Sequence, residues 1–211
     1  MRIAILGAGV MGRNMARVFL RCGGEVALYS RTEATLRSAR DALADEALDA
    51  LTTTSVIRDA VAGADLVIES VPEDLDLKRD VLAEVEAAVA DDTVVATNTS
   101  SLPIDELARD LRVARRFLAL HWFNPAHLVP LVEVVPCSAT APDVVAWCER
   151  VLLEAGKRPR VLRRAIPGFI ANRLQYALIR EALQLVADGV ADPETIDGVI
   201  TDCLGLRWAI I

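Results

Sequence analysis

The first two dozen residues restrict the fold more than any other stretch of the chain. Arg2–Leu6 is a short apolar run with β-branched residues, and it passes directly into the glycine-rich segment Gly7–Gly12. Apolar residues then recur at helical spacing from Met15 to Phe19, and a Gly-Gly pair follows that stops a helix. A strand, a GxGxxG turn and a helix, in this order, form the context in which proteins bind a dinucleotide. The sequence therefore predicts a dinucleotide-binding start.

Each part of this segment has its own physical task in such a site. Gly7 permits the tight turn, Gly9 lets the backbone approach a pyrophosphate, and Gly12 lets the helix pack close to the strand. The first helical turn, which contains Val10 and Met11, supplies amide donors and the positive end of the helix dipole. We predict that these five residues contact the cofactor.

Strand and helix patterns continue to alternate along most of the chain. The expected strands are Glu25–Tyr29, Leu51–Thr54, Leu66–Val71, Thr93–Thr97, Phe117–Leu120, Leu131–Val135 and a last one near Pro159–Leu162. A long helix is expected over Glu33–Ala50. This alternation predicts an α/β fold with a parallel, doubly wound, Rossmann-type sheet, and ligands bind at the carboxyl ends of such strands.

The residues after the second expected strand bear on cofactor choice. An NAD-selective site usually has Asp or Glu there to hold the ribose 2′-hydroxyl. This chain has Ser30, which cannot repel a 2′-phosphate, followed by Arg31, which could pair with one. The cofactor is therefore expected to be NAD or NADP, with NADP(H) accepted. The alternative is that Arg31 is merely exposed to solvent and that the site does not discriminate between NAD and NADP.

One histidine ends an apolar run, and a carboxylate lies inside the next run. His121 follows Phe117–Leu120, and Glu133 lies within Leu131–Val135. Two strands joined by a turn can bring these side chains together as an acid/base pair, in which the carboxylate fixes the tautomer of the imidazole. A satisfied core histidine and a rim glutamate are the ordinary alternative. Several other polar segments are expected at the carboxyl ends of the strands, where His121 also lies. This coincidence favours a catalytic role for His121 over the ordinary one.

The alternation breaks near Pro167. Residues 1–166 are expected to form the dinucleotide-binding domain, and residues 167–211 the start of a helical substrate or dimerisation domain. Its expected elements are an amphipathic helix over Ala171–Asp188 and a second helix from Asp192. The apolar residues from Arg207 to Ile211 are expected to be covered.

Composition excludes several other classes of protein. Lys and Arg number 23 and Asp and Glu 30, which gives a net charge of −7, and no basic block suits a nucleic-acid backbone. The four cysteines have no metal-ligand spacing, so no metal is expected. A basic leader and a run of about 18 apolar residues are both missing, so we expect a cytoplasmic protein without a membrane segment.

Six ordered motifs together resemble a known family. They are GAGVMG from Gly7, VIESVPEDLDLK at Val67–Lys78, ATNTSS at Ala96–Ser101, LHWFNP at Leu120–Pro125, PLVEVV at Pro130–Val135 and PGFIANR at Pro167–Arg173. The chain resembles the 3-hydroxyacyl-CoA dehydrogenase family, including its lambda-crystallin (L-gulonate 3-dehydrogenase) branch. The resemblance implies an NAD(P)-dependent oxidoreductase that interconverts a 3-hydroxyacyl group and its 3-oxo form, as in fatty acid metabolism.

Residue roles follow from this resemblance by position. His121 would be the general base and Glu133 would orient it, while Ser100 and Asn172 would hold the substrate oxygens. The cofactor would lie among Glu73, Lys78, Ser100 and Asn124. His127, in the turn after His121, is expected to be a surface or rim residue.

Three departures from the family pattern leave alternatives open. Ser30 replaces the family's aspartate at the ribose. The segment from Arg31 to Ala50 is short and acidic where relatives carry a basic helical hairpin that clasps CoA, which favours a free 3-hydroxy acid of gulonate type or a carrier-protein thioester. Relatives also continue for more helices, so the chain is expected to be either a truncated form or one that another polypeptide completes, and a homodimer if the missing region is supplied. A non-catalytic, dinucleotide-binding structural protein is the rival from another class.

Overall fold

The computed structural model describes residues 1–210, without the side chain of Ile210, and divides into two compact units. The first comprises Met1–Phe169, and the second begins at Ile170. Each unit is described by itself. Within the described residues, no helix is both long and apolar enough to cross a membrane.

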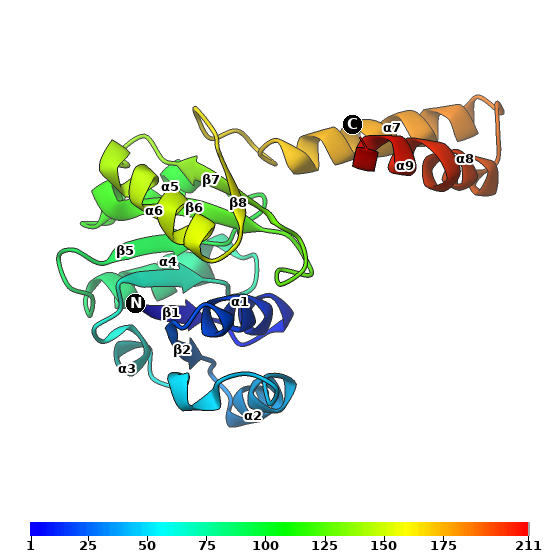
Figure 1. Ribbon diagram of the computed structural model, residues 1–211. Coiled ribbons are helices and arrows are strands. Elements are labelled where there is room, and N and C mark those ends of the chain that lie inside the picture. Colours follow the sequence, from blue (N-terminus) through cyan, green and yellow to red (C-terminus); the bar gives the residue numbers. More distant parts are fainter. Residues whose placement is uncertain (211) are drawn as a thin grey trace. The chain divides into compact units, whose positions relative to one another are not determined.

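The first unit is built on an eight-stranded sheet with the order β3-β2-β1-β4-β5-β6-β7-β8 (Figure 1). The strands are β1 (Arg2–Leu6), β2 (Glu25–Tyr29), β3 (Leu51–Thr54), β4 (Leu66–Glu69), β5 (Val94–Thr97), β6 (Phe117–Trp122), β7 (Leu131–Pro136) and β8 (Arg158–Val161). From β3 to β6 all neighbours are parallel, and the order reverses at β1. The predicted doubly wound, Rossmann-type sheet is confirmed in this part.

Helices pack on both faces of this sheet. They are α1 (Val10–Arg21), α2 (Glu33–Ala42), α3 (Ile57–Val61), α4 (Leu75–Glu86), α5 (Ile104–Ala108) and α6 (Pro142–Glu154). Ile3 and Ile5 of β1 face a core shared with α1, α2 and α6, whereas Ala4 and Leu6 face a core shared with α3, α4 and α5. This alternation follows from the two-residue period of a strand that is buried on both sides.

The prediction of a wholly parallel sheet is wrong at its far edge. β7 is antiparallel to β6, and β8 is parallel to β7. Only residues 123–130 separate β6 from β7, whereas a parallel return needs a crossover of a dozen or more residues. The short connection therefore forces the chain to turn back on itself.

The predicted helix over Glu33–Ala50 is also wrong in its second half, because α2 ends at Ala42. Arg17 of α1 donates to the Ala42 carbonyl and pairs with Asp45 at 3.1 Å. Arg21 pairs with Glu46 at 2.7 Å. These bonds fold the acidic segment back onto α1, and a 3-10 turn over Leu48–Ala50 then leads into β3.

The second unit consists of α7 (Ala171–Ala187), α8 (Pro193–Val199), a π-helical turn (Ile200–Leu204) and α9 (Gly205–Ile210). Asp192 caps α8 by accepting from the Thr195 amide at 2.8 Å, as the sequence predicted. None of the side chains described in this unit is buried. Among the terminal apolar residues expected to be covered, Trp208 is 56% exposed within this chain, and Ile211 lies outside the described residues.

Candidate active site

The glycine turn after β1 has the geometry that a pyrophosphate requires. Gly7 has a φ of 120°, and a Cβ atom there would lie 2.4 Å from the Ser70 carbonyl oxygen. A Cβ atom on Gly12 would lie 1.7 Å from the Gly7 carbonyl oxygen, so neither position admits a side chain. Gly9 is the N-cap of α1 and is exposed, with no atom within 4 Å of a Cβ built on it. These features fit a dinucleotide whose phosphates meet the first amides of α1.

The carboxyl ends of four strands meet beside this turn. Gly7 donates to Tyr29 of β2 at 2.9 Å, and Ser70, just after β4, donates to Leu6 at 2.7 Å. Asn98, just after β5, donates to the Ser70 hydroxyl and accepts from the Trp122 amide of β6 at 3.0 Å. Asn98 thus joins the strand ends into one edge, which is where a doubly wound sheet places its ligand.

Ser30 and Arg31 follow β2 at this edge. The Ser30 amide donates to the Thr54 carbonyl of β3 at 3.2 Å, and Ser30 is partly buried. The Arg31 side chain is exposed.

His121 and Glu133 lie together in the sheet. They are register partners of the antiparallel β6–β7 pair, and His121 Nδ1 is 2.8 Å from Glu133 Oε2. The two residues are 4% and 2% exposed. The His121 ring also contacts the rings of Phe123 and Phe169, at centroid distances of 4.4 and 5.2 Å. An ionised Glu133 accepts a hydrogen bond from the Nδ1–H group of His121. The Nε2 atom of the neutral imidazole is then free of a proton and can accept one.

A second polar network lies under the strand ends. Glu69 of β4 is fully buried and accepts from Lys78 Nζ at 2.7 Å and from the Thr97 hydroxyl at 2.6 Å. Lys78 also lies 3.4 Å from Glu73 Oε2. Burial raises the pKa of Glu69, and the Lys78 ammonium opposes that shift only in part.

Glu73 organises the loop that contains Ser100. It accepts from the Thr99 hydroxyl at 2.6 Å and from the amides of Ser100 and Ser101, both at 2.9 Å. Burial alone would raise the pKa of Glu73, but these donors and the Lys78 charge together lower it to about 2. Glu73 is therefore an anion that holds the 99–101 loop in place.

The predicted site residues are placed unequally. Lys78 is 1% exposed, and its ammonium is occupied by Glu69, the Val71 carbonyl and Glu73. Asn124 is exposed just beyond β6. Asn172 lies in the first turn of α7, in the second unit, so its part in the site stays a prediction. His127 is partly exposed in the turn between β6 and β7.

Two functional groups were missed from the sequence. Glu69 carries the buried network, and its signal was a carboxylate that ends an otherwise apolar strand. Asn98 appeared only within the ATNTSS motif, with no role assigned, although it accepts a hydrogen bond from the Trp122 amide of β6.

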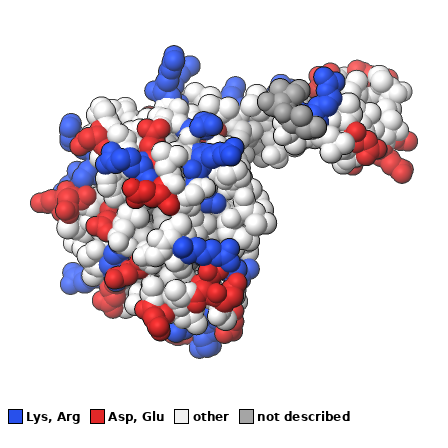
Figure 2. All heavy atoms as spheres, viewed as in Figure 1, with Lys and Arg blue, Asp and Glu red and all other residues white. Residues whose placement is uncertain are grey.

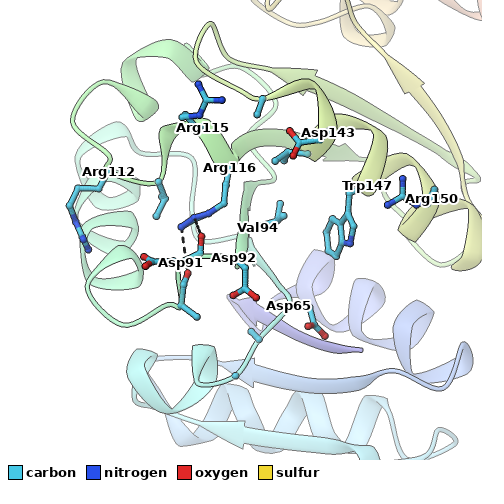
Figure 3. Close-up of a pocket in the computed structure, with 16 residues that line it drawn as sticks. Asp65, Asp91, Asp92, Val94, Arg112, Arg115, Arg116, Asp143, Trp147 and Arg150 are labelled. Carbon is cyan, nitrogen blue, oxygen red and sulfur yellow. Dashed lines mark hydrogen bonds between the residues drawn. The ribbon is translucent and has the colours of Figure 1, made fainter.

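A cavity of about 1040 Å³ lies at the other end of the strands, where β4 and β5 begin (Figure 3). Arg116 bonds the Asp91 carbonyl at 2.6 Å on its wall. Four arginines and four aspartates line this cavity, so its charge favours no ligand class, and none of the predicted site residues borders it. On the face drawn in Figure 2, basic and acidic side chains are likewise interspersed over the first unit.

Among the described residues, no group of three or more His, Cys, Asp or Glu side chains could hold a metal ion.

Comparison with known proteins identifies the family. Residues 2–165 match the family model described as "3-hydroxyacyl-CoA dehydrogenase, NAD binding domain", and residues 168–211 match the C-terminal domain of the same family. L-carnitine dehydrogenase of Streptomyces griseus is 43% identical over 100% of this chain and 67% of its own length. The lambda-crystallin homolog of Homo sapiens is 32% identical over 99% of this chain and 71% of its own, so the carnitine enzyme is the more similar of the two.

A solved structure agrees with this assignment. The NAD⁺-dependent 5-formyl-3-hydroxy-2-methylpyridine 4-carboxylic acid 5-dehydrogenase superimposes with a TM-score of 0.94 and 38% identity, over 100% of this chain and 72% of its own. The chain belongs to the 3-hydroxyacyl-CoA dehydrogenase family, whose members are NAD-dependent dehydrogenases that act on CH–OH groups.

Proposed function

We propose that this chain oxidises the C3 hydroxyl of a 3-hydroxy acid, or reduces the matching ketone, with His121 as the general base. The observation that carries the proposal is the buried His121–Glu133 pair, with its 2.8 Å contact, at the sheet edge that also holds the glycine turn. A base positioned at such an edge can take the hydroxyl proton, which contributes about 10²–10⁴-fold to such a reaction.

The residues of the chain divide the proton and binding steps between them. A bound NAD would supply the acceptor for the hydride that leaves the substrate carbon. His121 takes the hydroxyl proton on Nε2, and Glu133 stabilises the resulting imidazolium through Nδ1. Ser100 and Asn172 are proposed to hold the substrate oxygens, and Asn124 to lie beside the cofactor. Glu73 and Lys78 are proposed to act at the cofactor side by shaping the 99–101 loop.

A small free 3-hydroxy acid is the proposed substrate class, with an acyl thioester on CoA or a carrier protein as the second candidate. Arg17 and Arg21 are paired with Asp45 and Glu46, so these two cations are already occupied and are not free to bind a CoA phosphate. The carnitine enzyme, whose name denotes a free hydroxy acid, supports the same choice. The family name supports the thioester.

We also propose that NADP is accepted beside NAD. Ser30, rather than a carboxylate, stands directly after β2, where an acidic side chain would repel a 2′-phosphate, and the exposed Arg31 is available to pair with one. The proposed assembly is a homodimer formed through the helical region of the family.

The test is a turnover assay on L-carnitine, L-gulonate and acetoacetyl-CoA, beside a titration with NAD. The proposal expects NAD binding and turnover of at least one free hydroxy acid, with a higher kcat/KM than for the CoA thioester. Preference for the thioester would reverse the order of the two substrate classes. Cofactor binding with no turnover across a broad panel would favour a non-catalytic structural role instead.

A further inference from the structure

The segment that follows His121 is held from behind by a buried lysine. Lys157 lies between α6 and β8 and is 6% exposed. Its Nζ atom donates to the Ala126 carbonyl at 2.6 Å and to the Val129 carbonyl at 3.0 Å. The amide of the next residue, Arg158, donates to the Pro130 carbonyl at 2.7 Å. The α6–β8 junction thus holds the 123–130 segment at three of its carbonyls.

The partners of Lys157 are unusual for a buried cation. None of the ion pairs found among the described residues includes it. Besides the two carbonyls, Nζ lies 5.5 Å from the centroid of the Trp122 ring, within the range of a cation–π contact. A methionine of similar length would fill this space without desolvating a charge. The hydrogen-bond donors of Lys157, rather than its volume, therefore account for its presence.

The segment that Lys157 holds begins with a residue that contacts the imidazole. The 123–130 segment begins with Phe123, whose ring centroid is 4.4 Å from that of His121. Trp122, which Lys157 faces, is adjacent to His121 and makes an edge contact with Phe19 of α1 at 5.8 Å. Within the segment, the Leu128 and Val129 amides both donate to the Pro125 carbonyl at 3.0 Å, which forms a compact turn. A shift of this turn would move Phe123 against the His121 ring.

We propose that Lys157 is a positioning residue, which acts on His121 through the 123–130 segment. Its ammonium ties two carbonyls of the turn to the α6–β8 junction and so fixes the segment whose first residue, Phe123, contacts the imidazole. The inference rests on the proposed function for its kinetic consequence. The structural part, the anchoring of the segment, can be measured without a substrate.

The experiment compares the wild type with Lys157→Met, which keeps the length and loses the donors, and Lys157→Arg, which keeps the charge and the donors. Arg158→Met, at an exposed neighbouring position, is the matched control. Each variant is assayed for kcat and for the KM of NAD with the substrate found in the panel above. Hydrogen exchange is then measured at the Leu128 and Val129 amides and across β1 and β2.

Lys157→Met is expected to lower kcat about 10-fold and to leave the KM for NAD within about twofold, because misplacement of a catalytic group costs rate more than cofactor affinity. Exchange at Leu128 and Val129 should accelerate while β1 and β2 stay protected. Lys157→Arg should recover most of both losses, and Arg158→Met should match the wild type.

An unchanged kcat in Lys157→Met would overturn the positioning role, and so would exchange that accelerates across the whole sheet, because that shows a general loss of stability. If the wild type turns over no substrate, the proposed function fails, but the exchange result still decides the anchoring. In that case, unchanged exchange at Leu128 and Val129 in Lys157→Met would refute it.

Discussion

At the scale of single residues, the register of two strands determines the candidate chemistry. His121 and Glu133 are directly opposite in the β6–β7 pair, so their side chains project from the same face of the sheet. A slip of one residue would turn Glu133 to the other face and separate the pair. The carboxylate therefore contacts the imidazole because the short 123–130 connection sets this register.

The charge of Glu133 can be tested apart from its hydrogen bond. Glu133→Gln keeps an oxygen that can accept from His121 Nδ1 but removes the negative charge that stabilises an imidazolium. We expect kcat to fall about 10²-fold, at the lower end of what general-base catalysis contributes. Steady-state kinetics check this, with the melting temperature as the control for folding. A kcat within twofold of the wild type would show that the charge is not used.

Arg31 is the residue that tests cofactor choice. Arg31→Ala removes the exposed cation that could pair with a 2′-phosphate, so the KM for NADPH should rise about 10-fold while the KM for NADH changes little. Measuring both KM values in the wild type and the variant decides the matter. A strong NADH preference in the wild type that survives Arg31→Ala would end the proposal of NADP acceptance.

At the scale of elements, the β1–α1 turn separates a structural glycine from a ligand-facing one. Gly12→Ala places a Cβ atom against the Gly7 carbonyl and should lower the free energy of unfolding by about 1–3 kcal/mol, as overpacking does. Gly9→Ala meets no protein atom, so its stability should be retained. Its affinity for NAD should fall about 10-fold, since the methyl group occupies space that a pyrophosphate approaches. Chemical denaturation and NAD titration of both variants check this, and tight NAD binding by Gly9→Ala would contradict it.

The loop held by Glu73 should make stability depend on acid pH. The folded-state pKa of Glu73 is lowered from 4.5 to about 2, so its contribution is present above pH 4.5 and is lost as pH falls towards 2. Because the side chain is about a third exposed, we expect a loss of about 1–2 kcal/mol after solvent screening. The raised pKa of Glu69 acts in the window above 4.5, where stability increases as pH falls.

Denaturation at several pH values between 2 and 7 measures this dependence, with Glu73→Gln as the matched variant. That variant should lose the component below pH 4.5 and keep the component above it. An identical pH profile in both proteins would show that Glu73 does not hold the loop in the folded state.

At the scale of the whole molecule, local patterns predicted the elements better than their directions. The strand, glycine turn and helix at residues 2–21 were predictable because each step has a strong local cause, namely apolar runs, glycine conformations and helical spacing. The reversal at β7 depends on the length of the connection between β6 and β7. The periodicity of apolar residues carries no information about that length. The end of α2 depends on Arg17 and Arg21, which come from another helix.

The same division applies to the site. His121 and Glu133 could be found because both interrupt apolar strands at one sheet edge. The Glu69–Lys78 pair and the anchoring by Lys157 could not, since their partners are carbonyls and side chains brought together only by the tertiary fold. Asn172 lies in the second unit, so its role in the site stays a prediction.

The central claim, that His121 moves the hydroxyl proton, is tested most directly by kcat in His121→Gln. Glutamine approximates the size of the imidazole between Phe123 and Phe169 but cannot serve as the base. We predict that kcat falls about 10²–10⁴-fold while the Kd for NAD stays within about twofold, because the base acts in the chemical step alone. Near-normal turnover by His121→Gln would contradict the account.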